Sequence, residues 1–168
     1  MTTLAVDVRR AEPDDAVAIS ETHRAAWQQA YSGLIPYRAL RTMVERRSHR
    51  WWRRAIRGST SILVLEVGGV IAGYATLGLN RARSLPQEGE IYELYLKPEY
   101  QGIGFGSHLF REAKRLLSSL GCKGLVVWTL ADNDTAVDFY RALGGVDIAE
   151  GAESFDRQRI RKVAFVWP

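Results

Sequence analysis

A strand followed closely by three glycines constrains the fold of this chain more than any other stretch. Residues 90–96 are rich in aliphatic and aromatic residues and are predicted to form a strand, which Pro98 ends because proline cannot donate to a β-ladder. An amphipathic helix is predicted over residues 107–120, and the glycines lie just before it: Gly102, Gly104 and Gly106. Glycines this close together let several backbone N–H groups converge, and such a nest at a helix N-terminus suits phosphate oxygens. The stretch therefore predicts a phosphate-bearing ligand held between a strand and a helix.

The length and composition indicate one globular domain. At 168 residues the chain is expected to fold as a single domain, residues 1–168, with a sizeable core. No apolar run approaches the roughly 20 residues that span a bilayer, and the first residues lack the layout of a secretory signal. We therefore expect a cytoplasmic protein with no membrane partner. A single cysteine, Cys122, and three scattered histidines give no disulfide framework and no metal-ligand spacing, so no metal is expected.

The order of the predicted elements indicates a mixed α/β fold. Alternating or continuous apolar runs predict strands at 4–10, 61–67, 70–79, 90–96, 125–130, 146–150 and 161–167. Helical spacing predicts helices at about 14–31, 37–57, 107–120 and 132–143. Strand, helix and strand alternate in the middle, so that part of the sheet is expected to be parallel and the ends antiparallel. The prediction is a central mixed sheet of about six to seven strands flanked by about four helices.

Arginine dominates the basic residues, and the predicted helix 37–57 is especially rich in it. Of the 23 basic residues 19 are arginines, and eight of these lie in that helix. One interpretation is a basic surface for an acidic acceptor or for nucleic acid. The other is a solvated helix face whose tryptophans, Trp51 and Trp52, pack inward while arginine stems cover apolar surface. We favour the second, because no nucleic-acid-binding signature accompanies the arginines, and nucleic acid is not an expected partner.

The glycine spacing excludes two better-known phosphate loops. A dinucleotide-binding Gly-x-Gly-x-x-Gly would require glycine at position 107, which is serine, and an acidic residue about 20 positions further on. A P-loop would require Gly-Lys-Ser/Thr, which is absent. The spacing present is Gln101-x-x-Gly104-x-Gly106.

This spacing resembles the acetyl-CoA loop of the GNAT superfamily of N-acetyltransferases, whose signature is Gln/Arg-x-x-Gly-x-Gly/Ala. Glu-x-x-x-Leu-Tyr-Leu-x-Pro precedes it, and the stretch from Asn133 to Gly144 resembles the family's second conserved block. Motif-level similarity covers roughly residues 90–145, and the order of elements agrees from 4 to 167. Val146 departs from the pattern, because an aromatic residue is common there. The resemblance implies the GNAT fold and acetyl transfer from acetyl-CoA to a primary amine by direct attack in a ternary complex.

The resemblance also assigns roles to residues. Backbone N–H groups of the glycine loop bind the pyrophosphate, the strand at 94–96 bonds the pantetheine arm and polarises the acetyl carbonyl, and Asn133 contacts that arm. The acetyl-CoA residues so implied are Leu94, Tyr95, Leu96, Gln101, Gly102, Ile103, Gly104, Phe105, Gly106, Ser107, Asn133 and Tyr140. The Tyr140 hydroxyl approaches the sulfur and, with an ordinary pKa of about 10, can donate a proton to the departing thiolate. The other interpretation of Tyr140 is a core residue beside Phe139.

The general base is left with several candidates. Glu90 precedes Gln101 by eleven residues, where some family members place a base glutamate, and it could act directly or through water. Glu90 could equally be a strand-end carboxylate paired with an arginine, with a water chain carrying the proton. Glu93 has the opposite strand parity and is expected to point to the other face of the sheet.

The acceptor amine is the part of the reaction that the sequence determines least. The first two helices and the loops at 80–88 and 151–160 are expected to shape its pocket, with Trp27, Tyr31 and Tyr37 as apolar walls and Glu93 as a further candidate. His23 is expected to be a packed core residue rather than a catalyst. A small-molecule amine is the first hypothesis and the N-terminus or a lysine of a protein the second; a non-catalytic acyl-CoA-binding regulator is the third. A homodimer is compatible with the resemblance.

Overall fold

A single mixed sheet organises residues 4–168, the part of the chain that this computed structural model describes. In these residues it has seven strands, in the order β1-β2-β3-β4-β5-β7-β6. The strands are β1 (Val6–Arg10), β2 (Ser61–Val67), β3 (Val70–Leu79), β4 (Gly89–Leu96), β5 (Leu125–Leu130), β6 (Val146–Phe155) and β7 (Gln158–Trp167). Only β4 and β5 pair in parallel within this described range, and the other neighbours are antiparallel. The mixed sheet predicted from the sequence is confirmed.

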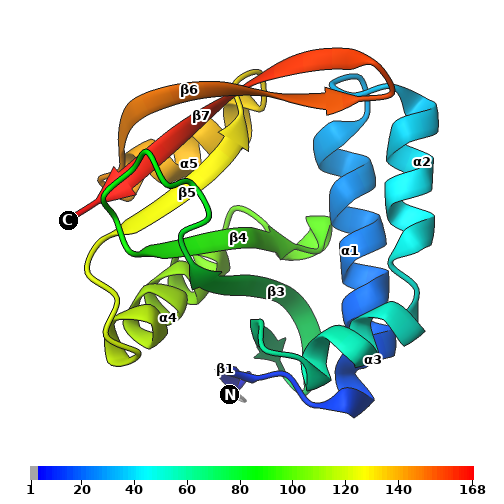
Figure 1. The fold of residues 1–168 in the computed structure, drawn as a ribbon. Coiled ribbons are helices and arrows are strands. Elements are labelled where there is room, and N and C mark those ends of the chain that lie inside the picture. Colours follow the sequence, from blue (N-terminus) through cyan, green and yellow to red (C-terminus); the bar gives the residue numbers. More distant parts are fainter. Residues whose placement is uncertain (1–3) are drawn as a thin grey trace.

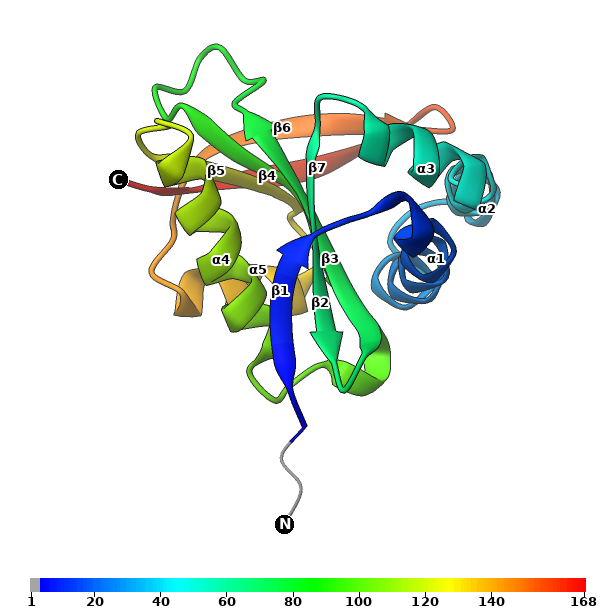
Figure 2. The ribbon, with the colours of Figure 1, turned by 90° about the horizontal axis from the view of Figure 1, so that it is seen from below.

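Helices cover both faces of the sheet. They are α1 (Ala16–Tyr31), α2 (Tyr37–Arg46), α3 (His49–Arg57), α4 (Phe105–Ser119) and α5 (Asp134–Ala142). Figure 2 shows α4 and α5 on one side of the sheet and α1, α2 and α3 on the other. The largest apolar cluster lies under α4 and α5, where Leu109 and Phe110 pack on strand residues such as Leu77 and Phe165. In the described chain no helix is both long enough and apolar enough to cross a membrane.

The stretch 37–57 forms two helices, so the prediction of one continuous helix is wrong. Ser48 has an extended backbone, and its hydroxyl accepts the N–H of Trp51 at 3.3 Å. Serine caps a helix N-terminus in this way, so a new helix begins at His49. Trp52 is fully buried, whereas Trp51 is partly exposed. Arg50, Arg54 and Arg57 of α3 are exposed, whereas Arg47, between α2 and α3, turns inward and bonds Glu93.

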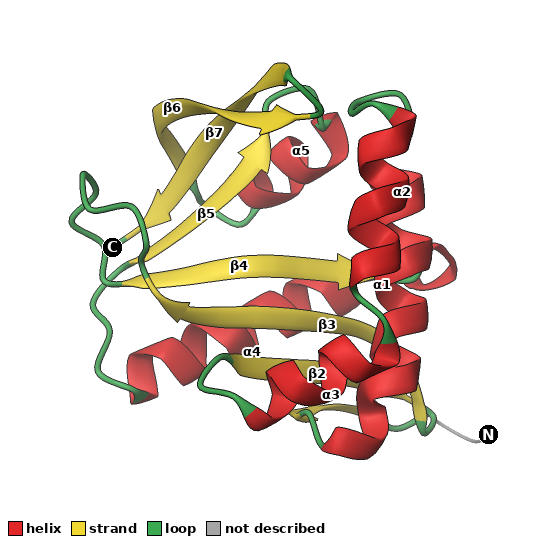
Figure 3. Cartoon of the chain, turned by 45° about the vertical axis from the view of Figure 1, so that its right-hand side comes forward, coloured by secondary structure: helices red, strands yellow, loops and turns green. Residues whose placement is uncertain are grey.

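The C-terminal hairpin is longer than predicted. The sequence indicated short strands around a polar loop at 151–160, whereas β6 and β7 are ten residues each and only Asp156 and Arg157 connect them. Both turn residues have positive φ, 47° and 71°, which is the backbone of a tight primed turn. The tip of the hairpin reaches α1 and α2 (Figures 1 and 3), where Phe155 and Ile160 pack against the cluster around Trp27.

Strands β4 and β5 separate beyond their first residues. Their ladder covers Gly89–Leu125, Glu90–Val126 and Ile91–Val127, and it ends there. From that point β5 continues to pair with β7, while β4 continues with β3. Figure 3 shows the two strands diverging toward α1. The second half of β4 therefore lacks a β5 partner, and we call the place where the two strands diverge the opening.

Candidate active site

The glycine loop presents a row of backbone donors at the start of α4. Gly102 and Gly104 have φ of +79° and +95°, a backbone conformation that residues other than glycine rarely adopt. Within residues 4–168, the N–H groups from Gly102 to Ser107 have no acceptor. A Cβ on Gly106 would lie 3.1 Å from the ring of Phe139, so glycine lets α4 approach α5 closely. The loop thus offers free N–H groups and the positive end of the helix dipole, worth about 0.3–1 kcal/mol for an anion at an exposed site.

The loop is anchored through Gln101. Its side-chain amide donates to the carbonyl of Leu96 at 3.1 Å and to Oε1 of Gln29 at 2.8 Å. Gln101 therefore ties the loop to the end of β4 and to α1, and its amide donor is used in doing so. The Phe105 ring is partly buried in the core, while the Ile103 side chain is 65% exposed.

The unpaired half of β4 borders this loop. Leu94 and Leu96 contact the core under α4 and α5. Tyr95 points to the opposite face, where its hydroxyl hydrogen-bonds that of Tyr31 from α1. Because burial raises their pKa values, that of Tyr31 to about 12 and that of Tyr95 well above 10, both phenols are neutral at physiological pH. The free edge of β4 and its two apolar side chains lie on the way from the glycine loop to the opening.

Helix α5 supplies Asn133 and Tyr140. Asn133 is the N-cap residue, outside the helix proper, and its side-chain oxygen accepts the N–H of Ala136 at 3.3 Å. Tyr140 is only 6% exposed, and its ring packs among those of Phe110 and Phe165. Burial and, to a smaller extent, the nearby Tyr31 hydroxyl raise the pKa of Tyr140 above its ordinary value. Tyr140 is thus both a core residue and a protonated phenol near the opening.

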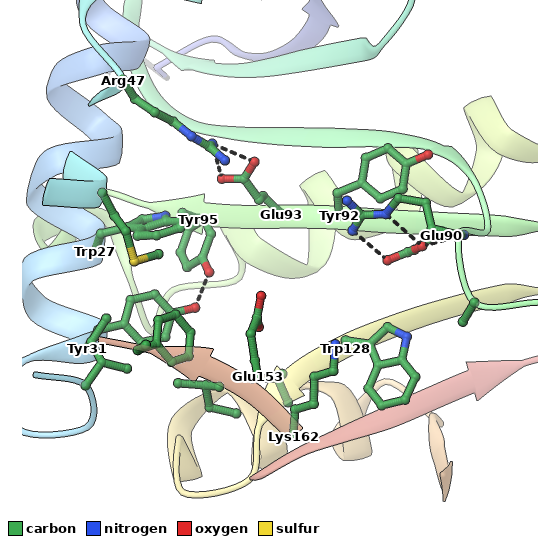
Figure 4. A pocket seen from close by; sticks show the side chains of 17 residues that line it. Trp27, Tyr31, Arg47, Glu90, Tyr92, Glu93, Tyr95, Trp128, Glu153 and Lys162 are labelled. Carbon is green, nitrogen blue, oxygen red and sulfur yellow. Dashed lines mark hydrogen bonds and ion pairs between the residues drawn. The ribbon is translucent and has the colours of Figure 1, made fainter. Parts of the chain in front are cut away.

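A cavity of about 570 Å³ lies on the other face of the sheet. It is bounded by α1, α2, the segment after β3, the strands β4 and β5, and the β6–β7 hairpin (Figure 4). Six aromatic residues line it: Trp27, Tyr31, Tyr92, Tyr95, Trp128 and Phe155. Six charged residues also line it: Arg47, Arg81, Glu90, Glu93, Glu153 and Lys162.

A β-bulge places Glu90 and Glu93 on the same face, so the predicted separation of the two is wrong. Thr76 on β3 faces Glu93 and Leu77 faces Ile91, which leaves Tyr92 as an extra residue on β4. One inserted residue shifts the alternation of side chains by one position. Both carboxylates therefore enter the cavity.

Glu90 is held by Arg81. Its side chain is almost fully buried and accepts the backbone N–H of Arg81 at 2.9 Å and the guanidinium at 3.0 and 3.3 Å. The Arg81 guanidinium also lies 4.0 Å from the centre of the Tyr92 ring. The sequence left open whether Glu90 is a base or a carboxylate paired with an arginine, and the structure shows the pairing. The same carboxylate also lines the cavity, so the pairing does not remove it from the site.

Glu93 is held by Arg47. One guanidinium nitrogen donates to both carboxylate oxygens, at 2.7 and 2.8 Å, and Tyr74 and Thr76 donate further hydrogen bonds at 3.0 and 3.2 Å. Arg47 also stacks against Trp51, with its guanidinium 4.5 Å from the ring centre. Nothing in the sequence distinguishes Arg47 from the arginines around it.

The structure changes the expected list of acceptor-side residues. Trp27 and Tyr31 line the cavity, whereas Tyr37 is 77% exposed and lies outside it. His23 packs against the Trp27 ring, fully buried, and burial lowers its pKa to about 3, so it is a neutral core residue as predicted. Sequence reasoning missed Arg47, Arg81, Trp128, Glu153 and Lys162. For the last two, the missed signal was the continuation of β6 and β7 through 151–160.

Comparison with known proteins gives the family. The model of the acetyltransferase (GNAT) family matches residues 19–144. An uncharacterized N-acetyltransferase of Bacillus subtilis, YuaI, is 27% identical over 97% of this chain and 93% of its own length. A spermidine N(1)-acetyltransferase of Thermoplasma acidophilum is 20% identical, over 82% of this chain and 86% of that protein.

Solved structures agree on the fold. The PaiA N-acetyltransferase of Thermoplasma acidophilum, crystallised with coenzyme A, superposes with a TM-score of 0.75 at 19% identity. The match covers 94% of this chain and 98% of that one. The sheet order, the glycine loop before α4 and the family match over residues 19–144 lead to one conclusion. This chain belongs to the GNAT family of acetyltransferases and is an enzyme of acetyl transfer.

Proposed function

We propose that this enzyme transfers the acetyl group of acetyl-CoA to a primary amine of a small molecule, by direct attack in a ternary complex. One observation carries the proposal: β4 and β5 diverge between the glycine loop, on the α4 side of the sheet, and the cavity, on the α1 side. A donor on one face and an acceptor on the other can meet at that opening without a covalent enzyme intermediate. Holding both reactants in one site supplies much of the rate.

The residues on the α4 and α5 side fit acetyl-CoA. The free N–H groups of 102–107 suit the pyrophosphate, and the unpaired edge of β4 suits the amide groups of a pantetheine arm. The side-chain NH₂ of Asn133 is left to bond the same arm, because only its oxygen is used in capping the helix. Acetyl-CoA supplies the activated acyl group, a thioester.

The chain's own groups then have defined tasks. The amine nitrogen forms a bond to the carbonyl carbon, the carbon–sulfur bond breaks, and the products are an amide and a thiol. A backbone N–H of β4 at the opening would stabilise the charge that develops on the carbonyl oxygen. Tyr140 would give its proton to the departing sulfur. Glu90 would receive the proton of the amine, through water, because Arg81 already bonds its oxygens.

A small acceptor is favoured over a peptide by the form of the cavity. Its volume of about 570 Å³ lies within the range of sites for small molecules, roughly 300–1,000 Å³. The β6–β7 hairpin packs against α1 and α2 and closes one side, where an extended peptide would need an open groove. Spermidine, named for one relative, is an amine of suitable size.

Binding and turnover test the proposal separately. We expect titration calorimetry to show acetyl-CoA binding, and thiol release to accelerate with a panel of small primary amines but not with peptides that have free N-termini or lysines. If acetyl-CoA does not bind, the proposal is wrong. Turnover with peptides alone would make the acceptor a protein, and binding with no turnover on either panel would indicate a regulator.

The role of Glu90 has its own test in the kinetics of two variants. We expect Glu90→Gln to lower kcat/KM by about a hundredfold, the usual size of a general-base contribution. Arg81→Gln is the matched variant, because it keeps the carboxylate and removes only the guanidinium that bonds it, so it should retain more activity than Glu90→Gln. Native kcat/KM in Glu90→Gln would show that the proton leaves by another route.

A further inference from the structure

Two of the charged residues in the cavity have no ionic partner. Glu90 is paired with Arg81 and Glu93 with Arg47, so these four charges are compensated inside the protein. Glu153 of β6 and Lys162 of β7 also line the cavity. Among residues 4–168, neither of them has an ion pair or a hydrogen-bonding side-chain partner. The cavity thus contains one available negative and one available positive charge.

The hairpin geometry holds these two charges apart on one face. Lys162 is opposite Gly151, and Glu153 is two residues along β6, so both side chains project from the same side of the hairpin. Figure 4 shows both reaching into the cavity, with Glu153 between Tyr31 and Lys162, and Lys162 beside Trp128. They lie beyond ion-pair distance from each other. An acceptor with two opposite charges can therefore bond both without displacing an existing pair.

The direction of the Lys162 side chain is determined by its neighbours. Its ammonium lies 4.7 Å from the centre of the Trp128 ring, where the ring quadrupole attracts a cation. A Cβ at Gly151 would lie 3.3 Å from Cε of Lys162, so glycine leaves the room that this side chain occupies. The lysine is thus directed across the hairpin into the cavity rather than into solvent.

We propose that the acceptor is a diamino acid, whose α-carboxylate binds Lys162 and whose α-ammonium binds Glu153, while its side-chain amine is acetylated. This inference rests on the proposed function and adds the chemical class of its substrate. The α-amine cannot be the nucleophile in this arrangement, because a carboxylate partner keeps it protonated. A second amine, on a chain of methylenes along the aromatic wall of Trp27, Tyr31 and Tyr95, is the group left to react.

Three compounds of equal chain length isolate the two contacts in the native enzyme. Lysine carries both head-group charges, cadaverine lacks the carboxylate, and 6-aminohexanoate lacks the α-ammonium. We expect kcat/KM for lysine to exceed that for each of the others by about tenfold, the usual value of one charge-assisted hydrogen bond. Each compound keeps a terminal amine, so differences in kcat/KM among the three report the contribution of the head group alone.

Variants assign each contact to its residue. Glu153→Gln should lower kcat/KM for lysine and for cadaverine, which has a second ammonium, and leave 6-aminohexanoate unchanged. Lys162→Gln should lower kcat/KM for lysine and 6-aminohexanoate and leave cadaverine unchanged. Thermal unfolding of both variants would show that they remain folded, and the comparison in the native enzyme does not depend on them.

The outcomes separate this inference from the proposed function. Equal kcat/KM for the three compounds, or equal losses for all three in either variant, would overturn the diamino acid. Turnover of another small amine with none of the three would also overturn it, while the proposed function would stand. Failure to bind acetyl-CoA would overturn the proposed function itself.

Discussion

Tyr140→Phe is expected to lower kcat by about a hundredfold and to leave the affinity for acetyl-CoA unchanged. In the proposed reaction the phenol donates the proton that the departing thiolate needs, and phenylalanine keeps the ring but loses the donor. The ring packing against Phe110 and Phe165 should survive, because the substitution removes only one oxygen. Pre-steady-state kinetics would place the loss in the chemical step, and calorimetry would report the affinity.

The pH dependence gives this prediction a second readout. Burial disfavours the phenolate, so the pKa of Tyr140 is raised and the proton-bearing form persists to higher pH than in a free tyrosine. We therefore expect no loss of kcat from its ionisation below about pH 10. Tyr37→Phe is the control, because that tyrosine is exposed and outside the cavity. If Tyr140→Phe retains native kcat, the proton is donated by another group and the assignment is wrong.

Gly104→Val is expected to weaken acetyl-CoA binding by ten- to a hundredfold, or about 1.4–2.8 kcal/mol. Gly104 has φ of +95°, where a β-branched residue is a strained outlier. Relief of that strain would rotate the peptide groups of the loop, and the N–H groups of 102–107 would no longer converge. Calorimetry with acetyl-CoA measures the loss directly.

Gly121 offers a matched control at the other end of the same helix. It also has positive φ, +88°, and like Gly104 it has no atom near the position of a Cβ. Gly121→Val should therefore lower the melting temperature by a similar amount but leave the affinity for acetyl-CoA native. If both variants bind acetyl-CoA as the native protein does, the glycine loop is not the pyrophosphate site.

Local chemistry made the glycine loop and the cap of α5 predictable. The strand at 90–96, the glycine spacing and the helix that follows are contiguous, so their arrangement is determined by neighbouring residues. Gly102 and Gly104 have the positive φ that such a loop requires, and the loop lies before α4 as expected. Asn133 caps α5 through its own side chain, which is also a local interaction. The order of strands and helices was predictable for the same reason.

The acceptor side depended on interactions between distant segments. The bulge at Tyr92 arises from the register of β4 against β3, and it reversed the expected side of Glu93 relative to Glu90. The hairpin of β6 and β7 closes through Asp156 and Arg157, which lack the Asn-Gly signature of a primed turn, so the sequence predicts strands that end early.

The sequence by itself determined the fold, the family resemblance and the glycine loop, because each is specified by residues close together in the chain. The tertiary structure decided which charges enter the cavity and which remain unpaired there. Arg47 and Glu93 are 46 residues apart, and their contact joins the end of α2 to the middle of β4. Glu153 and Lys162 share a face only through the pairing of β6 with β7. Side-chain pairing across elements has no local signature, since packing and register fix it only when the whole sheet has formed.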